Sequence, residues 1–240
     1  MNLKNFISMI VSFIYPVTCS CCGKNIDCRL GISICAKCMA KLPVISGFVC
    51  KKCGLPLRDG GMHCYKCLKN PSEIKADAVR CLYLYKDDAR KLILKLKYSD
   101  RMFLAKDLGQ ALAAKLKECD FYRQTDLITA VPLNAVRKIK RGYNQAWLLA
   151  ARVSKCVNLP ATNKVLYRKK MTKPQFKLSK KERAANIKNS FYVKNANLIK
   201  NKNVLLIDDI VTTAATASAC AQVLKKSGAK KVYVLALARD

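Results

Sequence analysis

The stretch VLLIDDIVTTAAT, residues 204–216, is the part of this 240-residue chain that decides its fold class. Its first four residues form an unbroken apolar run, which is typical of a parallel strand buried on both faces. Two adjacent acids follow, Asp208 and Asp209, and a loop rich in threonine then leads into a helix from about Ala215 to Lys226. We therefore expect a strand, a loop and a helix, with both acids at the carboxyl edge of a sheet, where ligands of open α/β folds bind.

This strand, loop and helix offer the groups that bind a phosphorylated sugar. Two carboxylates can hold the hydroxyl groups of a sugar diol. The first N–H groups of a helix have no partner within the helix and attract an anion. We expect a diol on the acids and a phosphate on the loop. The alternative is structural, in which the acids and threonines only cap the helix.

The same stretch resembles the fingerprint of the phosphoribosyltransferases, which is an apolar strand, two acids, two further residues and then Thr-Thr-Gly-x-Thr. The resemblance implies that Asp208 and Asp209 bind the ribose hydroxyls of phosphoribosyl pyrophosphate, which carries Mg²⁺. The chain departs from the fingerprint where Ala214 replaces glycine, so a positive φ angle at this position would strain the loop or weaken binding. The resemblance also implies that the loop cradles the 5′-phosphate with Thr212, Thr213, Ala214, Ala215 and Thr216.

The rest of the chain after residue 71 alternates strands and helices. Such alternation implies an α/β fold, a mostly parallel sheet flanked by helices with right-handed crossovers. We expect a basic loop at residues 137–141, a mobile loop at 171–179 and a capped helix at 179–187. Apolar runs and helical spacing predict strands at residues 78–85, 127–131, 165–167 and 232–237, and helices at 89–96, 103–116 and around a buried stripe of Ala146, Leu149, Ala150 and Val153.

The first 70 residues have a different character, because they hold most of the 14 cysteines. Two C-x2-C pairs together supply the four thiolates of a tetrahedral zinc site, so four pairs predict two structural Zn²⁺ sites. Linkers of similar length leave open whether pairs join in sequence or cross over. The four pairs are Cys19 with Cys22, Cys35 with Cys38, Cys50 with Cys53, and Cys64 with Cys67.

This composition predicts two domains, a zinc-binding module at residues 1–70 and an α/β domain at residues 71–240. We expect the metals to replace a small hydrophobic core, because all-cysteine sites have no open coordination position for catalysis. Metal-ligand spacing in place of disulfides fits a reducing cytoplasm. The apolar run at residues 6–14 is about 9 residues long, whereas a membrane span needs about 20. We interpret it as a short helix docked on a core, with membrane attachment as the alternative.

The charge of the chain favours a polyanionic partner. Its formal net charge is +31, and two four-thiolate zinc sites would lower this to about +27. From Leu127 to Ile207 there are 19 Lys and Arg residues and one acid, Glu182. Phosphates attract cations whatever the fold, although a lysine-rich composition can also serve solubility alone.

The whole chain is similar to the ComF family of competence proteins, which joins an N-terminal cysteine module to a phosphoribosyltransferase-type domain. The family resemblance implies single-stranded DNA binding and a role in natural transformation, with other competence proteins as further partners. It rests on motifs in family order: residues 131–133 (VPL), 141–145 (RGYNQ), 172–175 (TKPQ), 178–186 (LSKKERAAN) and 232–239 (VYVLALAR).

The resemblance also places a pyrophosphate-binding loop after Val131, within the cationic third of the chain. A single basic side chain is more often a solvated surface charge, so the cluster as a whole supports the prediction. The residues expected to meet pyrophosphate or a DNA backbone are Arg137, Lys138, Lys140, Arg141, Asn144 and Gln145.

Three functions remain open at this point. The first is a protein that handles single-stranded DNA in natural transformation and keeps a phosphoribosyl pyrophosphate site. The second is an active phosphoribosyltransferase of nucleotide salvage or synthesis, in which pyrophosphate leaves as a base attacks the ribose. The third is a zinc-stabilised interaction module with an inert α/β domain. We rank DNA handling first because the chain shows no added segment that would recognise a base.

Overall fold

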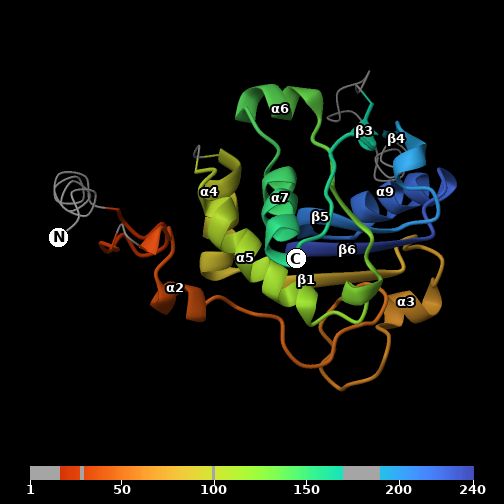
Figure 1. The fold of residues 1–240 in the computed structure, drawn as a ribbon. Coiled ribbons are helices and arrows are strands. Elements are labelled where there is room, and N and C mark those ends of the chain that lie inside the picture. The colour runs from red at the N-terminus through yellow and green to blue at the C-terminus, as the bar shows by residue number, and fades with distance from the viewer. Residues whose placement is uncertain (1–16, 28–29, 99–100, 170–189) are drawn as a thin grey trace, which may run out of the picture.

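A computed structural model describes residues 17–27, 30–98, 101–169 and 190–240 (Figure 1). The expected N-terminal helix, the mobile loop at 171–179 and the capped helix at 179–187 lie outside these residues. No helix in the described part of the chain combines enough length with enough apolar character to cross a bilayer.

The centre of the molecule is a four-stranded parallel sheet with the strand order β1-β6-β5-β2. Its strands are β1 (Ala78–Leu84), β2 (Leu127–Ala130), β5 (Asn203–Val211) and β6 (Lys231–Arg239). The register pairs Val204 of β5 with Leu127 of β2 and with Val232 of β6. The two central strands are almost wholly buried, which explains why their sequences are unbroken apolar runs.

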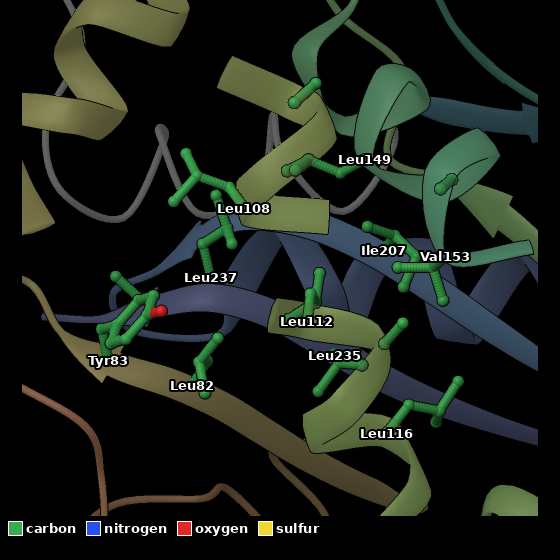
Figure 2. Packing of buried hydrophobic residues seen from close by; sticks show 14 of the residues in the cluster. Leu82, Tyr83, Leu108, Leu112, Leu116, Leu149, Val153, Ile207, Leu235 and Leu237 are labelled. Carbon is green, nitrogen blue, oxygen red and sulfur yellow. The ribbon is translucent and has the colours of Figure 1, made fainter. Parts of the chain in front are cut away.

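Helices cover both faces of the sheet (Figure 1). One face carries α4 (Asp87–Tyr98), α5 (Leu104–Lys117) and α7 (Gln145–Val157). Leucines of α5 and α7 pack on Ile207, Leu235 and Leu237 (Figure 2). The other face carries α9 (Ala215–Lys226). Beside α9 lies a two-stranded antiparallel sheet of β3 (Leu166–Arg168) and β4 (Phe191–Val193). The expected α/β fold, a parallel sheet flanked by helices, is confirmed.

The basic segment predicted as a loop at residues 137–141 is instead a helix, α6 (Ala135–Arg141). Its ends are specified by local chemistry. The Oδ1 of Asn134 accepts a hydrogen bond from the Val136 N–H at 2.9 Å and caps the start. Gly142 ends the helix in the left-handed region, at φ 75°. The run of charges favours a loop, whereas the two caps specify a helix.

The cysteine-rich segment packs against the free edge of the sheet. Two short helices, α2 (Ala36–Ala40) and α3 (Tyr65–Lys69), each begin directly after a cysteine. In the segment between α2 and α3, the Ile45 N–H donates to the Leu82 carbonyl at 2.8 Å. This segment thereby covers the edge of β1. Short 3₁₀ turns at Tyr122–Gln124 and Ala196–Leu198 complete the described elements.

Candidate functional site

The acid pair lies near the carboxyl end of β5. Asp208 and Asp209 are buried, with 8% and 5% of their surfaces exposed. The Lys97 ammonium lies 2.8 Å from Oδ2 of Asp209, and the Gln145 amide donates to the same oxygen at 3.0 Å. Because these donors come from α4 and α7, two helices hold the second acid in place.

The first acid of the pair ionises less readily than a free carboxyl. Burial raises the pKa of Asp208 well above its usual range, and the negative charge of Asp209 raises it further. The Asp209 N–H donates to Oδ1 of Asp208 at 2.8 Å, and this bond together with the Lys97 charge opposes the rise. The pair therefore differs from two free carboxylates, since Asp209 is ion-paired and Asp208 has a raised pKa.

Lys97 is a site residue that the sequence analysis missed. It stands in the last turn of α4, where basic residues are common whatever the function. Only the packing of α4 on the sheet brings it to the end of β5. A ribose diol that binds Asp209 must share this carboxylate with Lys97, whereas Asp208 has no such ion pair among the described residues.

The loop after β5 has a strained backbone at Ala214, where the sequence analysis expected strain if the φ angle was positive. Ala214 is buried and lies in the left-handed region, at φ 61° and ψ 9°, directly before α9. A residue with a Cβ costs about 1–2 kcal/mol in this conformation, and glycine avoids that cost. Thr212 and Thr213 are exposed beside it, while Ala215 and Thr216 are half-buried in the first turn of the helix.

The six residues expected to meet phosphate divide into three groups. Arg137, Lys138 and Lys140 are exposed on α6. Asn144 supports the backbone, since its Oδ1 caps α7 at Ala146 N and its amide donates to the Val131 carbonyl. Arg141 and Gln145 reach the acid pair, because a guanidinium N–H of Arg141 donates to Oε1 of Gln145 at 3.1 Å, and Gln145 in turn holds Asp209.

Arg168, at the end of β3, is a second residue that the sequence analysis did not select. Its Nε is buried and has no hydrogen-bond partner within the described ranges. Burial lowers the pKa of Arg168, and the positive charge of Arg137 lowers it further. Arg168 is thus a half-buried cation with a spare donor at the end of the small sheet beside α9.

The eight cysteines form two clusters of four, and pairs adjacent in sequence share a cluster. Cluster 1 is Cys19, Cys22, Cys35 and Cys38, and cluster 2 is Cys50, Cys53, Cys64 and Cys67. Within each cluster all four sulfurs lie within 4.8 Å of one another. A tetrahedron with Zn–S bonds of about 2.3 Å separates its sulfurs by about 3.8 Å. The Cys22–Cys35 and Cys53–Cys64 sulfur distances of 4.0 and 3.6 Å fit this geometry.

Both clusters are zinc sites of the closed, structural kind, with four thiolates and no place for a substrate. The sequential pairing resolves the alternative that the sequence left open. Cluster 1 is also fastened to the helices of the sheet. Oδ2 of Asp107 in α5 accepts from the N–H and the hydroxyl of Ser33 at 2.6 and 2.7 Å, and from Ile34 N at 3.1 Å.

Comparison with known proteins finds a family match for each of the two parts of the chain. Residues 10–68 match a family model described as a double zinc ribbon domain, and residues 108–240 match a phosphoribosyl transferase domain. Competence protein F of Haemophilus influenzae is 32% identical over 194 residues, which cover 79% of this chain and 84% of that protein. DNA utilization protein YhgH of Escherichia coli is 29% identical over 194 residues, covering 80% and 84%. Competence protein ComFC of Bacillus subtilis is 26% identical over 199 residues, covering 81% and 79%.

Proposed function

The chain belongs to the ComF family, and on that premise we propose that it handles single-stranded DNA in natural transformation and binds phosphoribosyl pyrophosphate with Mg²⁺ at the end of β5. One observation carries the proposal. The acid pair and the threonine loop follow each other at the carboxyl edge of the sheet, and hydrogen bonds through Gln145 and Arg141 connect Asp209 to the basic helix α6. A ligand site and a polyanion-binding surface are therefore adjacent.

The residues at this edge suit a phosphorylated ribose. Asp208 offers its carboxyl oxygens to the diol, and Thr212, Thr213 and the first turn of α9 offer hydroxyl and N–H donors to a 5′-phosphate. Mg²⁺ would find oxygen ligands on Asp208 and on the ligand, and it would neutralise pyrophosphate charge. Arg168, with its spare donor, adds a second cation for the same purpose.

The DNA part of the proposal is supported by charge and by relatives. The segment from Leu127 to Ile207 holds 19 basic residues and one acid. Arg137, Lys138 and Lys140 of this segment are exposed on α6. Relatives covering four-fifths of the chain are named for competence or DNA utilization. Cations on an exposed helix bind a DNA backbone through phosphate contacts and counterion release.

Anisotropy of a labelled single strand, measured over a salt series with and without phosphoribosyl pyrophosphate, tests this function. The logarithm of the binding constant should fall by about 0.7 per neutralised phosphate for each decade of salt. Neutralising two cations, Arg137→Gln with Arg141→Gln, should reduce that slope by about 1.4. Phosphoribosyl pyrophosphate should compete, because its pyrophosphate shares those cations.

The matched control changes two exposed lysines by the same charge at the opposite end of the sheet, Lys226→Gln with Lys230→Gln. It should leave the slope almost unchanged. Equal slopes in both double variants would contradict the placement of DNA on α6. Absence of salt-dependent binding by the unaltered protein would contradict DNA handling altogether.

A transfer reaction is the second candidate, favoured by the state of Asp208. A carboxyl whose pKa is raised binds a proton more tightly than a free carboxyl, and such a group can take up the proton that an attacking base loses. Pyrophosphate release, followed over a panel of bases and nucleic acids, tests this reaction. Release that survives Asp208→Asn would exclude such a role for this carboxyl.

A further inference from the structure

Tyr98 ends α4 as an exposed aromatic residue beside a basic side chain. It is 65% exposed, although the Arg141 guanidinium carbon lies 4.5 Å from the centre of its ring. Exposing a large aromatic ring forgoes the free energy of burying it. Tyr83 of the same protein is buried in the core, and the hydroxyl of Tyr143 donates to a carbonyl. Tyr98 therefore presents an aromatic face that folding alone does not require.

The position of Tyr98 is fixed by contacts on both sides. The hydroxyl of Tyr143 donates to the Leu96 carbonyl at 2.6 Å and ties the end of α4 to the segment after α6. The next residue, Lys97, holds Asp209. Three consecutive residues of α4 thus contact the segment 141–145, either directly or through Asp209.

Arg141 links this aromatic face to the candidate ligand site. The same guanidinium that stands over Tyr98 donates to Gln145, which holds the Asp209 carboxylate. The hydrogen bond limits the movement of a side chain that would otherwise be free in solvent. A planar guanidinium can also stack on a ring, which the ammonium of lysine cannot do. Tyr98 and Arg141 together place an aromatic ring and a guanidinium side by side at the end of α6, and Gln145 connects them to the acid pair.

We propose that Tyr98 and Arg141 form a stacking site for one unpaired nucleobase of a DNA strand whose phosphates lie on α6. Single-stranded nucleic acid is bound by aromatic and guanidinium faces flanked by cations, because every base has a face that can stack. Bases in a duplex are already stacked on one another, so this site would favour single strands. The inference rests on the proposed DNA-handling function. It adds that the strand contacts the protein through a nucleobase as well as through its phosphates.

Anisotropy with two labelled strands of equal length, an oligothymidylate and an abasic deoxyribose phosphate, tests this site. The unaltered protein should prefer the strand with bases. Tyr98→Leu should weaken binding of that strand by about tenfold, the typical effect of one lost base–aromatic stack. It should leave the abasic affinity and the salt slope unchanged, because no phosphate contact is lost. Tyr98→Phe should keep the preference.

Tyr65→Leu is the matched control. Tyr65 is 77% exposed on α3 with the Lys69 ammonium 5.9 Å from its ring centre, and α3 and α6 lie on opposite sides of the sheet (Figure 1). This change should alter neither strand's affinity. Arg141→Lys keeps the positive charge but removes the planar guanidinium. It should reduce the preference for the strand with bases and leave the melting temperature of the protein unchanged.

Each part of the proposal fails on a different result. Salt-dependent binding of both strands with equal affinity would overturn the base site and leave DNA handling intact. Failure of the unaltered protein to bind either strand would contradict DNA handling itself. Competition by free thymine that depends on Tyr98, without any base preference between strands, would reassign the site to a free base and overturn its assignment to a strand.

Discussion

Cluster 2 and the acid pair are both buried beside the same sheet, but they are assembled in different ways. The four thiols of cluster 2 come from Cys50 to Cys67, a short run of neighbouring residues. The acid pair on β5 is held by Lys97 of α4 and Gln145 of α7, so three separate elements meet at Asp209. A metal site of this kind can be encoded locally, whereas the charged site exists only once the sheet and two helices have formed.

Zinc removal should produce the largest effect, and it should act on the locally built region. Each structural zinc contributes an apparent 10–16 kcal/mol or so to the folding of a small zinc-bound unit. A chelator should therefore unfold the cysteine-rich segment and uncover the edge of β1. Zinc analysis together with thermal unfolding checks this. An unchanged melting temperature after both ions are removed would contradict the structural role.

The two clusters should also differ from each other. All four cysteines of cluster 2 are buried in the core that includes β1, whereas Cys22 of cluster 1 is exposed. Cys53→Ser should therefore lower the melting temperature more than Cys22→Ser does. Equal losses would indicate that the metal, and not its packing on the sheet, sets the stability of the segment.

Loss of Lys97 should have the next largest effect. Lys97→Met removes one partner of a buried pair and should destabilise the fold by about 3–5 kcal/mol, because Asp209 is left buried without its cation. Adding Asp209→Asn should recover part of this loss. Denaturant unfolding of the two single variants and the double variant measures the coupling. Additive losses would show that the ion pair contributes nothing of its own.

Asp208 should make stability depend on pH in a defined direction. Its pKa is raised in the folded state, so the folded protein binds this proton more tightly than the unfolded chain. Its contribution is fully present below the unfolded pKa, near 3.9, and is lost as pH rises toward the folded pKa. Asp208→Asn stays neutral and should gain stability over the parent protein across that window.

The gain cannot exceed about 1.4 kcal/mol per pH unit for a single proton. Paired denaturation curves at several pH values measure it. Parallel pH profiles for the two proteins would show that Asp208 ionises normally. A gain would identify Asp208 as a residue kept at the expense of stability, as is common at ligand sites.

The smallest effect concerns the left-handed residue before α9. Ala214→Gly should stabilise the fold by about 1 kcal/mol or less, because relief of backbone strain is partly offset by greater freedom in the unfolded chain. It should also tighten binding of phosphoribosyl pyrophosphate. Thermal unfolding and calorimetry measure these two effects, and a loss in both would show that the loop is not strained by alanine.

The difference between cluster 2 and the acid pair also explains which features could be predicted from the sequence. The run at residues 204–226 predicted β5, the loop and α9 because hydrophobicity, acids and a helix start follow one another along the chain. The cysteine spacing predicted both metal clusters for the same local reason. The caps of α6, Asn134 and Gly142, were also visible in the sequence, so that helix could have been found.

Other parts of the site were beyond such local patterns. Nothing near Lys97 distinguishes it from any lysine at a helix end, and its partner lies 112 positions away in sequence. The spare donor of Arg168 and the exposed ring of Tyr98 are likewise consequences of packing. Patterns of short range predicted the elements and the metal ligands, whereas long-range contacts determined which charges meet.

Calorimetric titration of phosphoribosyl pyrophosphate with Mg²⁺ tests the central claim most directly. The protein should bind the ligand, and the double variant Asp208→Asn with Asp209→Asn should lose that binding while keeping its zinc and its cooperative unfolding. Unchanged affinity in a folded double variant would contradict the assignment of the acid pair to the ribose.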